Sequence, residues 1–153
     1  MPASPRSPFA YVILRVVPRV ERGECINAGI LLWSRPLRFL GARVHLDAGR
    51  LAALAPDCDP VAVHQQLDAI ARVAAGDRSA GPMARLAKPE RFHWLASPSS
   101  TIVQRSEVHT GITGDPGATL EHLFDTLVAT AAPDRAAFDQ RSSAPRVLAE
   151  DRR

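Results

Sequence analysis

The chain has 153 residues, 46% hydrophobic and only 5% aromatic, which suits a single domain with a mostly aliphatic core. Its formal net charge of +3 permits an anionic partner but does not by itself indicate nucleic-acid binding. The two cysteines, Cys25 and Cys58, lie far apart and outside any CxxC pair, which argues against a zinc site or a disulfide framework. No apolar run approaches the roughly 20 residues that span a bilayer, and Met1–Pro8 does not resemble a signal peptide, so we expect a cytoplasmic protein without membrane contact.

The first part of the chain predicts three strands. Residues 9–17 are β-branched and aromatic, and both alternate sets of side chains are apolar except for Arg15. This pattern predicts a strand buried on both faces. Two further strands are predicted over about 24–33 and 37–46, and neighbouring strands with short links favour an antiparallel meander.

Two helices are predicted after the third strand. Asp47 caps a short helix over 48–54, and Asp59 caps a longer helix that begins at Pro60 and ends at Gly76. Aspartate before a helix, proline in its first turn and glycine after its last turn are preferred at those positions. The long helix has an apolar stripe that would face the sheet: Val63, Leu67, Ile70, Ala71 and Ala74.

Strands and helices also alternate in the last part of the chain. A short helix is predicted over about 89–95, and strands are predicted over 101–105 and 108–112. The pair Asp115-Pro116 repeats the N-cap and proline signal and begins a helix that should continue to about Ala131.

Together these elements predict an α+β fold: an antiparallel sheet of four or five strands with two main helices packed on one face. We expect a single domain over residues 9–132, preceded by a flexible lead-in over 1–8. Residues 133–153 are predicted to form a weakly ordered tail, because they contain too few apolar residues to anchor themselves.

Polar groups are concentrated in the segment Arg22-Gly23-Glu24-Cys25-Ile26-Asn27-Ala28-Gly29, between two apolar runs. Glycine inside a strand indicates a bulge or a close backbone approach, as predicted for Gly29. If the strand is regular, Asn27, Gly29 and Leu31 share one face.

Arg15 needs a partner or solvent, because a charge within an apolar strand is otherwise costly. It shares a face with Tyr11 and Ile13 in the predicted strand. In the structural interpretation Arg15 lies at an edge position or pairs with a carboxylate. Glu24 then pairs with Arg15 or Arg22, and Asn27 satisfies backbone groups. In the functional interpretation Arg15 binds an anion, and Arg22, Glu24 and Asn27 form a polar cluster at a sheet end.

A second polar cluster contains Ser99, Ser100 and Thr101, followed by Arg105 and His109. Hydroxyls and backbone amides ahead of a strand can cradle an anion, or they can serve ordinary turn chemistry. His109 is the candidate for proton transfer by residue type, with Glu24 of the first cluster as the other. A ligand site built from both clusters requires them to meet in space.

Signatures of specific chemistry are absent. The chain contains no GxxxxGK[ST], strand-linked GxGxxG or GxSxG motif, and its histidines lack metal-ligand spacing. We therefore expect no metal and no cofactor, and the sequence leaves open whether the protein is an enzyme.

A family resemblance is carried by six segments: Tyr11–Pro18, Arg22–Leu32, Arg91–Leu95, Ser99–Thr101, Val108–Gly111 and the helix Thr119–Val128. With these segments the chain resembles DUF3037, a family of uncharacterised bacterial proteins, over about residues 9–131. The family has no established activity to transfer. Family members look as if they are often encoded beside HipA-like kinase genes, so the resemblance implies such a kinase as a partner and implies nothing about chemistry.

Three functions compete. The first is an accessory module that binds a protein partner, such as a HipA-like kinase, through a sheet edge or the polar surface. The second is a small enzyme or binding protein for a nucleotide or phosphorylated compound, held by Arg15, Arg22 and Arg105 and oriented by Asn27 and Ser100. Nucleic-acid binding comes third, because the charges are mixed and no basic stripe is evident.

Overall fold

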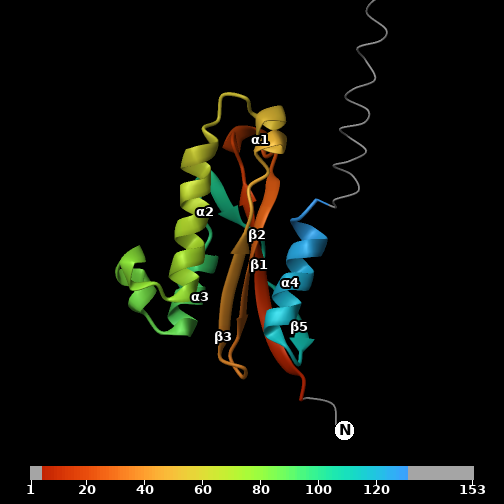
Figure 1. The fold of residues 1–153 in the computed structure, drawn as a ribbon, viewed down its shortest axis with the longest axis vertical. Helices are drawn as coiled ribbons and strands as arrows, with labels where there is room; N and C mark the ends of the chain where they lie inside the picture. Colours follow the sequence, from red (N-terminus) through yellow and green to blue (C-terminus); the bar gives the residue numbers. More distant parts are fainter. Residues whose placement is uncertain (1–4, 131–153) are drawn as a thin grey trace, which may run out of the picture.

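A five-stranded antiparallel sheet lies between two layers of helices in the computed structural model, which describes residues 5–130 (Figure 1). The α+β class and the antiparallel sheet are confirmed. The strands are β1 (Ser7–Val16), β2 (Ile26–Ser34), β3 (Phe39–Val44), β4 (Val103–Arg105) and β5 (His109–Thr113). The helices are α1 (Ala48–Leu54), α2 (Pro60–Ala75), α3 (Lys88–Ala96) and α4 (Pro116–Leu127), with 3₁₀ turns at Val20–Arg22, Arg78–Ala80 and Pro82–Arg85.

The predicted meander of the first three strands is confirmed by the order β3-β2-β1. On its other side β1 pairs with two strands in turn, β4 near its end and β5 near its start. Ser106 bridges the gap between them: its Oγ accepts from the Ile13 N–H at 2.8 Å, and its own N–H donates to the Ile13 carbonyl at 2.9 Å. The two short strands therefore form one interrupted sheet edge.

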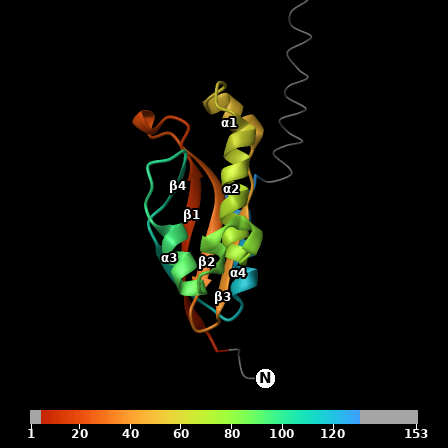
Figure 2. The same ribbon diagram turned by 90° about the vertical axis from the view of Figure 1, so that its left-hand side faces the viewer.

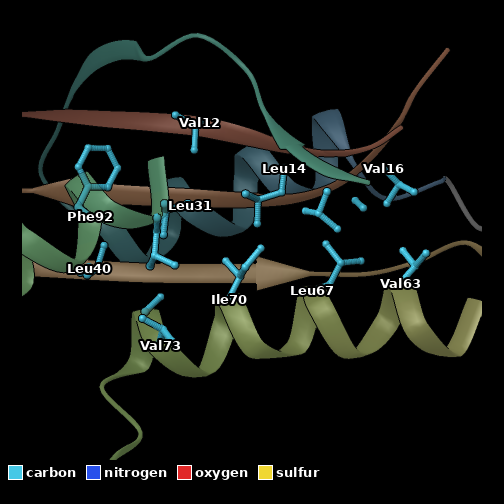
Figure 3. Close-up of a cluster of buried hydrophobic side chains, with 14 of the residues drawn as sticks. Val12, Leu14, Val16, Leu31, Leu40, Val63, Leu67, Ile70, Val73 and Phe92 are labelled. Atoms are coloured by element: carbon cyan, nitrogen blue, oxygen red, sulfur yellow. The ribbon is translucent and has the colours of Figure 1, made fainter. Parts of the chain in front are cut away.

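The first face of the sheet is covered by α2, with α3 beside it (Figures 1 and 2). Every second residue of β1 points to this face, and the α2 side chains point toward the same layer (Figure 3). Val73 joins this core although the predicted stripe omitted it, whereas Ala71 is only half-buried. The main members of this core are Val12, Leu14, Val16, Leu31, Val63, Leu67, Ile70, Val73 and Leu95.

The opposite face is covered by α4 (Figure 1), so the prediction that both main helices pack on one face was wrong. Ile13 of β1 belongs to this second core, together with Ile30 and Leu32 of β2 and with Leu120 and Phe124 of α4. The physical reason is the strand itself: both alternate sets of β1 side chains are apolar, and each set needs its own cover.

The predicted helix starts are confirmed. The side chains of Asp47, Asp59 and Asp115 each accept a backbone N–H at the start of α1, α2 and α4, at 3.0–3.1 Å. Gly76 ends α2 with a left-handed φ of 75°. Each cap contributes about 1 kcal/mol to stability. It depends only on residues close together in the chain, so it can be predicted from the sequence without knowledge of the tertiary structure.

Some predicted boundaries differ from the structure. β1 begins at Ser7, inside the predicted lead-in, and α4 ends at Leu127 rather than near Ala131. The predicted tail over 133–153 lies outside the described residues. None of the described helices is both long and apolar enough to cross a membrane.

A β-bulge interrupts the pairing of β1 with β2 at Gly29, as its position in the strand predicted. Leu14 pairs with Gly29 and Arg15 pairs with Asn27, which leaves Ala28 as the extra residue. The bulge changes the alternation: Leu31 lies in the core under α2, whereas Asn27 faces α4. The prediction that Asn27 and Leu31 share one face was therefore wrong, because an extra residue reverses the side-chain order.

Gly29 also permits a close approach of β3. A Cβ at this position would lie 2.9 Å from the Arg43 carbonyl oxygen and 2.9 Å from a methyl carbon of Val44. We expect Gly29→Ala to destabilise the fold by about 1–3 kcal/mol, because the backbone of β3 would have to move. Urea unfolding followed by circular dichroism measures this change.

The matched control is Gly49→Ala in α1. A Cβ there meets no atom closer than 3.4 Å, and alanine favours a helix by about 0.5–1 kcal/mol over glycine. Equal unfolding free energies for the two variants would contradict the crowding at Gly29.

Candidate functional site

Three polar side chains form a row across adjacent strands. Arg15 of β1 pairs with Asn27 of β2 on one side and with Gln104 of β4 on the other. Cross-strand partners project from the same face of a sheet, about 5 Å apart. The Asn27 Nδ2 donates to the carbonyl of Leu127 at 3.1 Å, which places this polar row on the α4 face, beside the last turn of that helix.

Arg15 is the member of the polar row with spare hydrogen-bonding capacity. Its side chain is half-buried, and within residues 5–130 it has neither a hydrogen bond nor an ion pair, so the expected carboxylate partner is not among them. Among residues 5–130, none of its nitrogens is a buried atom that lacks a hydrogen-bond partner. A guanidinium with open donors is chemically suited to a carboxylate or phosphate.

Arg22 and Glu24 form an exposed ion pair with each other in the loop between β1 and β2. This confirms one of the two partners expected for Glu24. Close by, Arg19 and Asp57 form another ion pair at 3.2 Å across a shallow hollow of about 280 Å³. The cations of this loop therefore have carboxylate partners, which weakens their attraction for an external anion.

Ser99, Thr101 and Arg105 of the second predicted cluster lie on the other face of the sheet. Arg105 pairs with Leu14, whose side chain is in the core under α2. Its guanidinium donates to the Leu95 carbonyl at 2.6 Å and to the Ser99 Oγ at 2.9 Å, and burial lowers its pKa. The hydroxyls of Ser99 and Thr101 both donate to the Val103 carbonyl. These contacts join the end of α3 to β4, which is the turn chemistry of the structural interpretation.

Ser100 and His109 stand apart from that network. Ser100 is exposed in the loop before β4. His109 pairs with Tyr11 on the α4 face, and the two rings stack with centroids 5.1 Å apart. No three histidine, cysteine or acidic side chains within residues 5–130 are grouped so that they could hold a metal.

The structure therefore does not bring the two predicted clusters together, because His109 lies on a different face from the rest of the second cluster. Arg15, Asn27 and His109 lie on the α4 face, whereas Ser99, Thr101 and Arg105 lie on the face covered by α2 and α3. Roles in ligand binding stay predictions for all of them, as does proton transfer by Glu24 or His109. Sequence reasoning did not select Gln104 as a site residue, because only the pairing register places it beside Arg15.

The fold and the polar row define a small α+β protein with a two-sided sheet and an arginine open to solvent on one face. Residues 11–128 match the family model described as "Protein of unknown function (DUF3037)", so the chain belongs to this family. Neither the curated proteins nor the solved structures contain a match to the chain.

Arg105 and Arg15, in the adjacent strands β4 and β1, should differ in their effect on stability. We expect Arg105→Met to lower the unfolding free energy by about 1–3 kcal/mol, because the Leu95 carbonyl loses its charged donor. Arg15→Met should change it by no more than about 0.5 kcal/mol, because methionine keeps the apolar stem and no described contact is lost. Chemical denaturation of both variants measures the difference; an equal loss for Arg15→Met would show that Arg15 has a structural partner.

Proposed function

We propose that the protein is a cytoplasmic accessory module that binds an extended segment of a protein partner along the edge of β5. The observation that carries this proposal is the open edge itself. Among the described strands β5 pairs only with β1, so its outer backbone N–H and C=O groups have no strand beside them. An edge of this kind is a template for adding a strand.

The two edges of the sheet differ in protection. On β3, the exposed Arg43 forms an ion pair with Glu121 and lies 4.2 Å over the Phe124 ring, and α2 and α4 both contact the strand. Charged side chains and covering helices are usual means of blocking edge-to-edge pairing.

β5 lacks these protections. Its sequence, His-Thr-Gly-Ile-Thr, contains no lysine, arginine or proline. Ile112 is 65% exposed, and Val108 just before the strand is 53% exposed. A partner strand with apolar residues at alternate positions would cover these side chains while its backbone completes the ladder.

The family resemblance supports a HipA-like kinase as the first partner to test. We expect a purified HipA-like kinase from the same organism to form a complex with it. We expect Ile112→Lys to abolish co-elution, because a charge would be buried where an apolar side chain packs. Size-exclusion chromatography with the purified pair measures this.

The matched control is Val61→Lys in α2, since Val61 is 62% exposed and remote from the β5 edge in the chain. Val61→Lys should leave the complex intact. Separate elution of the wild-type proteins at micromolar concentration would refute the kinase as partner. Self-association that Ile112→Lys removes, without any kinase complex, would assign the edge to a second copy of this chain.

A second candidate function is binding of a small anion, and the open donors of Arg15 favour it. Asn27 is held by the Leu127 carbonyl, and Gln104 is on the other side of Arg15, so amide groups flank the guanidinium. Such a row can bind a carboxylate or phosphate without a catalytic role.

Thermal shift with a panel of nucleotides and phosphorylated metabolites tests this candidate. We expect any stabilisation by a bound anion to disappear in Arg15→Met, because the open guanidinium is lost. Arg22→Met is the control, since Arg22 already pairs with Glu24. Loss of the shift in Arg22→Met alone would place the anion in the loop and contradict the role of Arg15.

A further inference from the structure

A second open hollow, unrelated to the predicted clusters, lies at the other end of the sheet. It has a volume of about 480 Å³, and its lining residues come from the β2–β3 hairpin and from the first turn of α3. The hairpin lies at the lower end of the sheet in Figure 1. Its volume is in the range of about 300–1,000 Å³ usual for small-molecule sites. It is lined by Trp33, Arg35, Arg38, Lys88 and Pro89.

Contacts between distant parts of the chain fix the walls of this hollow. The Lys88 Nζ donates to the Arg38 carbonyl at 2.6 Å, which ties α3 to the hairpin. The Arg38 N–H donates to the Arg35 carbonyl at 3.1 Å and closes the turn, with Arg38 at a left-handed φ of 51°. Trp33 stacks with Phe92 of α3, with ring centroids 6.5 Å apart. The hairpin backbone, the Lys88 ammonium and the Trp33 indole are therefore held in place before any ligand arrives.

The charge of this hollow is not neutralised within the described residues. Arg35, Arg38 and Lys88 take part in none of the ion pairs among residues 5–130. Glu90 follows Lys88 by two positions in α3, and residues at that spacing do not face each other on a helix. At the opposite end of the sheet, in contrast, Arg19 pairs with a carboxylate.

We propose that this hollow binds a nucleotide. Phosphate groups would accept hydrogen bonds from the guanidinium groups of Arg35 and Arg38 and from the Lys88 ammonium, whose other two N–H donors are not used by the Arg38 carbonyl. The planar base would lie against the indole of Trp33, which supplies an aromatic face for stacking. The cations favour an anionic ligand, and the indole favours an anion that also carries a planar aromatic ring.

Tryptophan fluorescence tests this site. Trp94 is the other tryptophan and lies on the exposed side of α3, so Trp94→Phe leaves Trp33 as the only indole. We expect ADP to quench this signal saturably, and adenosine or pyrophosphate alone to bind more weakly. Lys88→Met and Arg35→Gln should each weaken ADP binding about tenfold, the usual effect of losing one charged hydrogen bond. Arg50→Gln in α1 removes one exposed positive charge elsewhere and should change nothing.

Several results would overturn the proposal. They include the absence of saturation at millimolar ADP, an equal loss of affinity in Arg50→Gln, and full binding in the Lys88→Met variant. If Arg15→Met abolishes ADP binding while Lys88→Met does not, the nucleotide belongs to the polar row instead. An oligonucleotide that binds more tightly than ADP, with a steep dependence on salt, would replace the proposal with strand binding.

Discussion

The fold depends on the fact that β1 is apolar on both faces. Val12 and Leu14 are fully buried on one side of the sheet, and Ile13 is buried on the other. Exposing either set would forfeit roughly 1.5–3 kcal/mol for each large side chain, so both faces need a layer of helices. α2 and α4 supply those layers, and they leave the strand edges and the two ends of the sheet as the places where the surface can carry function.

Because both faces of β1 are covered, a charge within this strand is unusual, and Arg15 is the one charged residue in it. It lies on the face that α4 covers, beyond the apolar positions and beside the last turn of that helix. The bulge at Gly29 turns Asn27 toward the same face while Leu31 stays in the opposite core. An irregularity of one residue in β2 therefore allows a polar row and a continuous apolar core to share the same pair of strands.

Local signals predicted the strands, the capped helices and the bulge, because aspartate caps, proline positions and an in-strand glycine act within a few residues. The face covered by α4 was predicted wrongly, although the sequence already contained the argument: a strand buried on both faces is incompatible with helices on only one. The candidate site was harder to predict than the fold. The type of a residue shows which hydrogen bonds and ion pairs its side chain can make, but not which of them it makes in the folded protein. Arg105 and Arg15 have the same side chain, yet contacts from α3 occupy one, and no described residue pairs with the other.

The number of cationic side chains without an ion-pair partner among the described residues is therefore a better guide to function here than the local density of polar residues. The loop around Arg22 has many polar groups, but its cations pair with neighbouring carboxylates. The cations around Trp33 could not be grouped from the sequence, because β3, α1 and α2 lie between Trp33 and Lys88 in the chain. Folding places them on one hollow without an opposing carboxylate from the described ion pairs. A charge without an ionic partner is unfavourable unless solvent or a ligand of opposite charge can reach it. An open hollow gives both of them access to these cations.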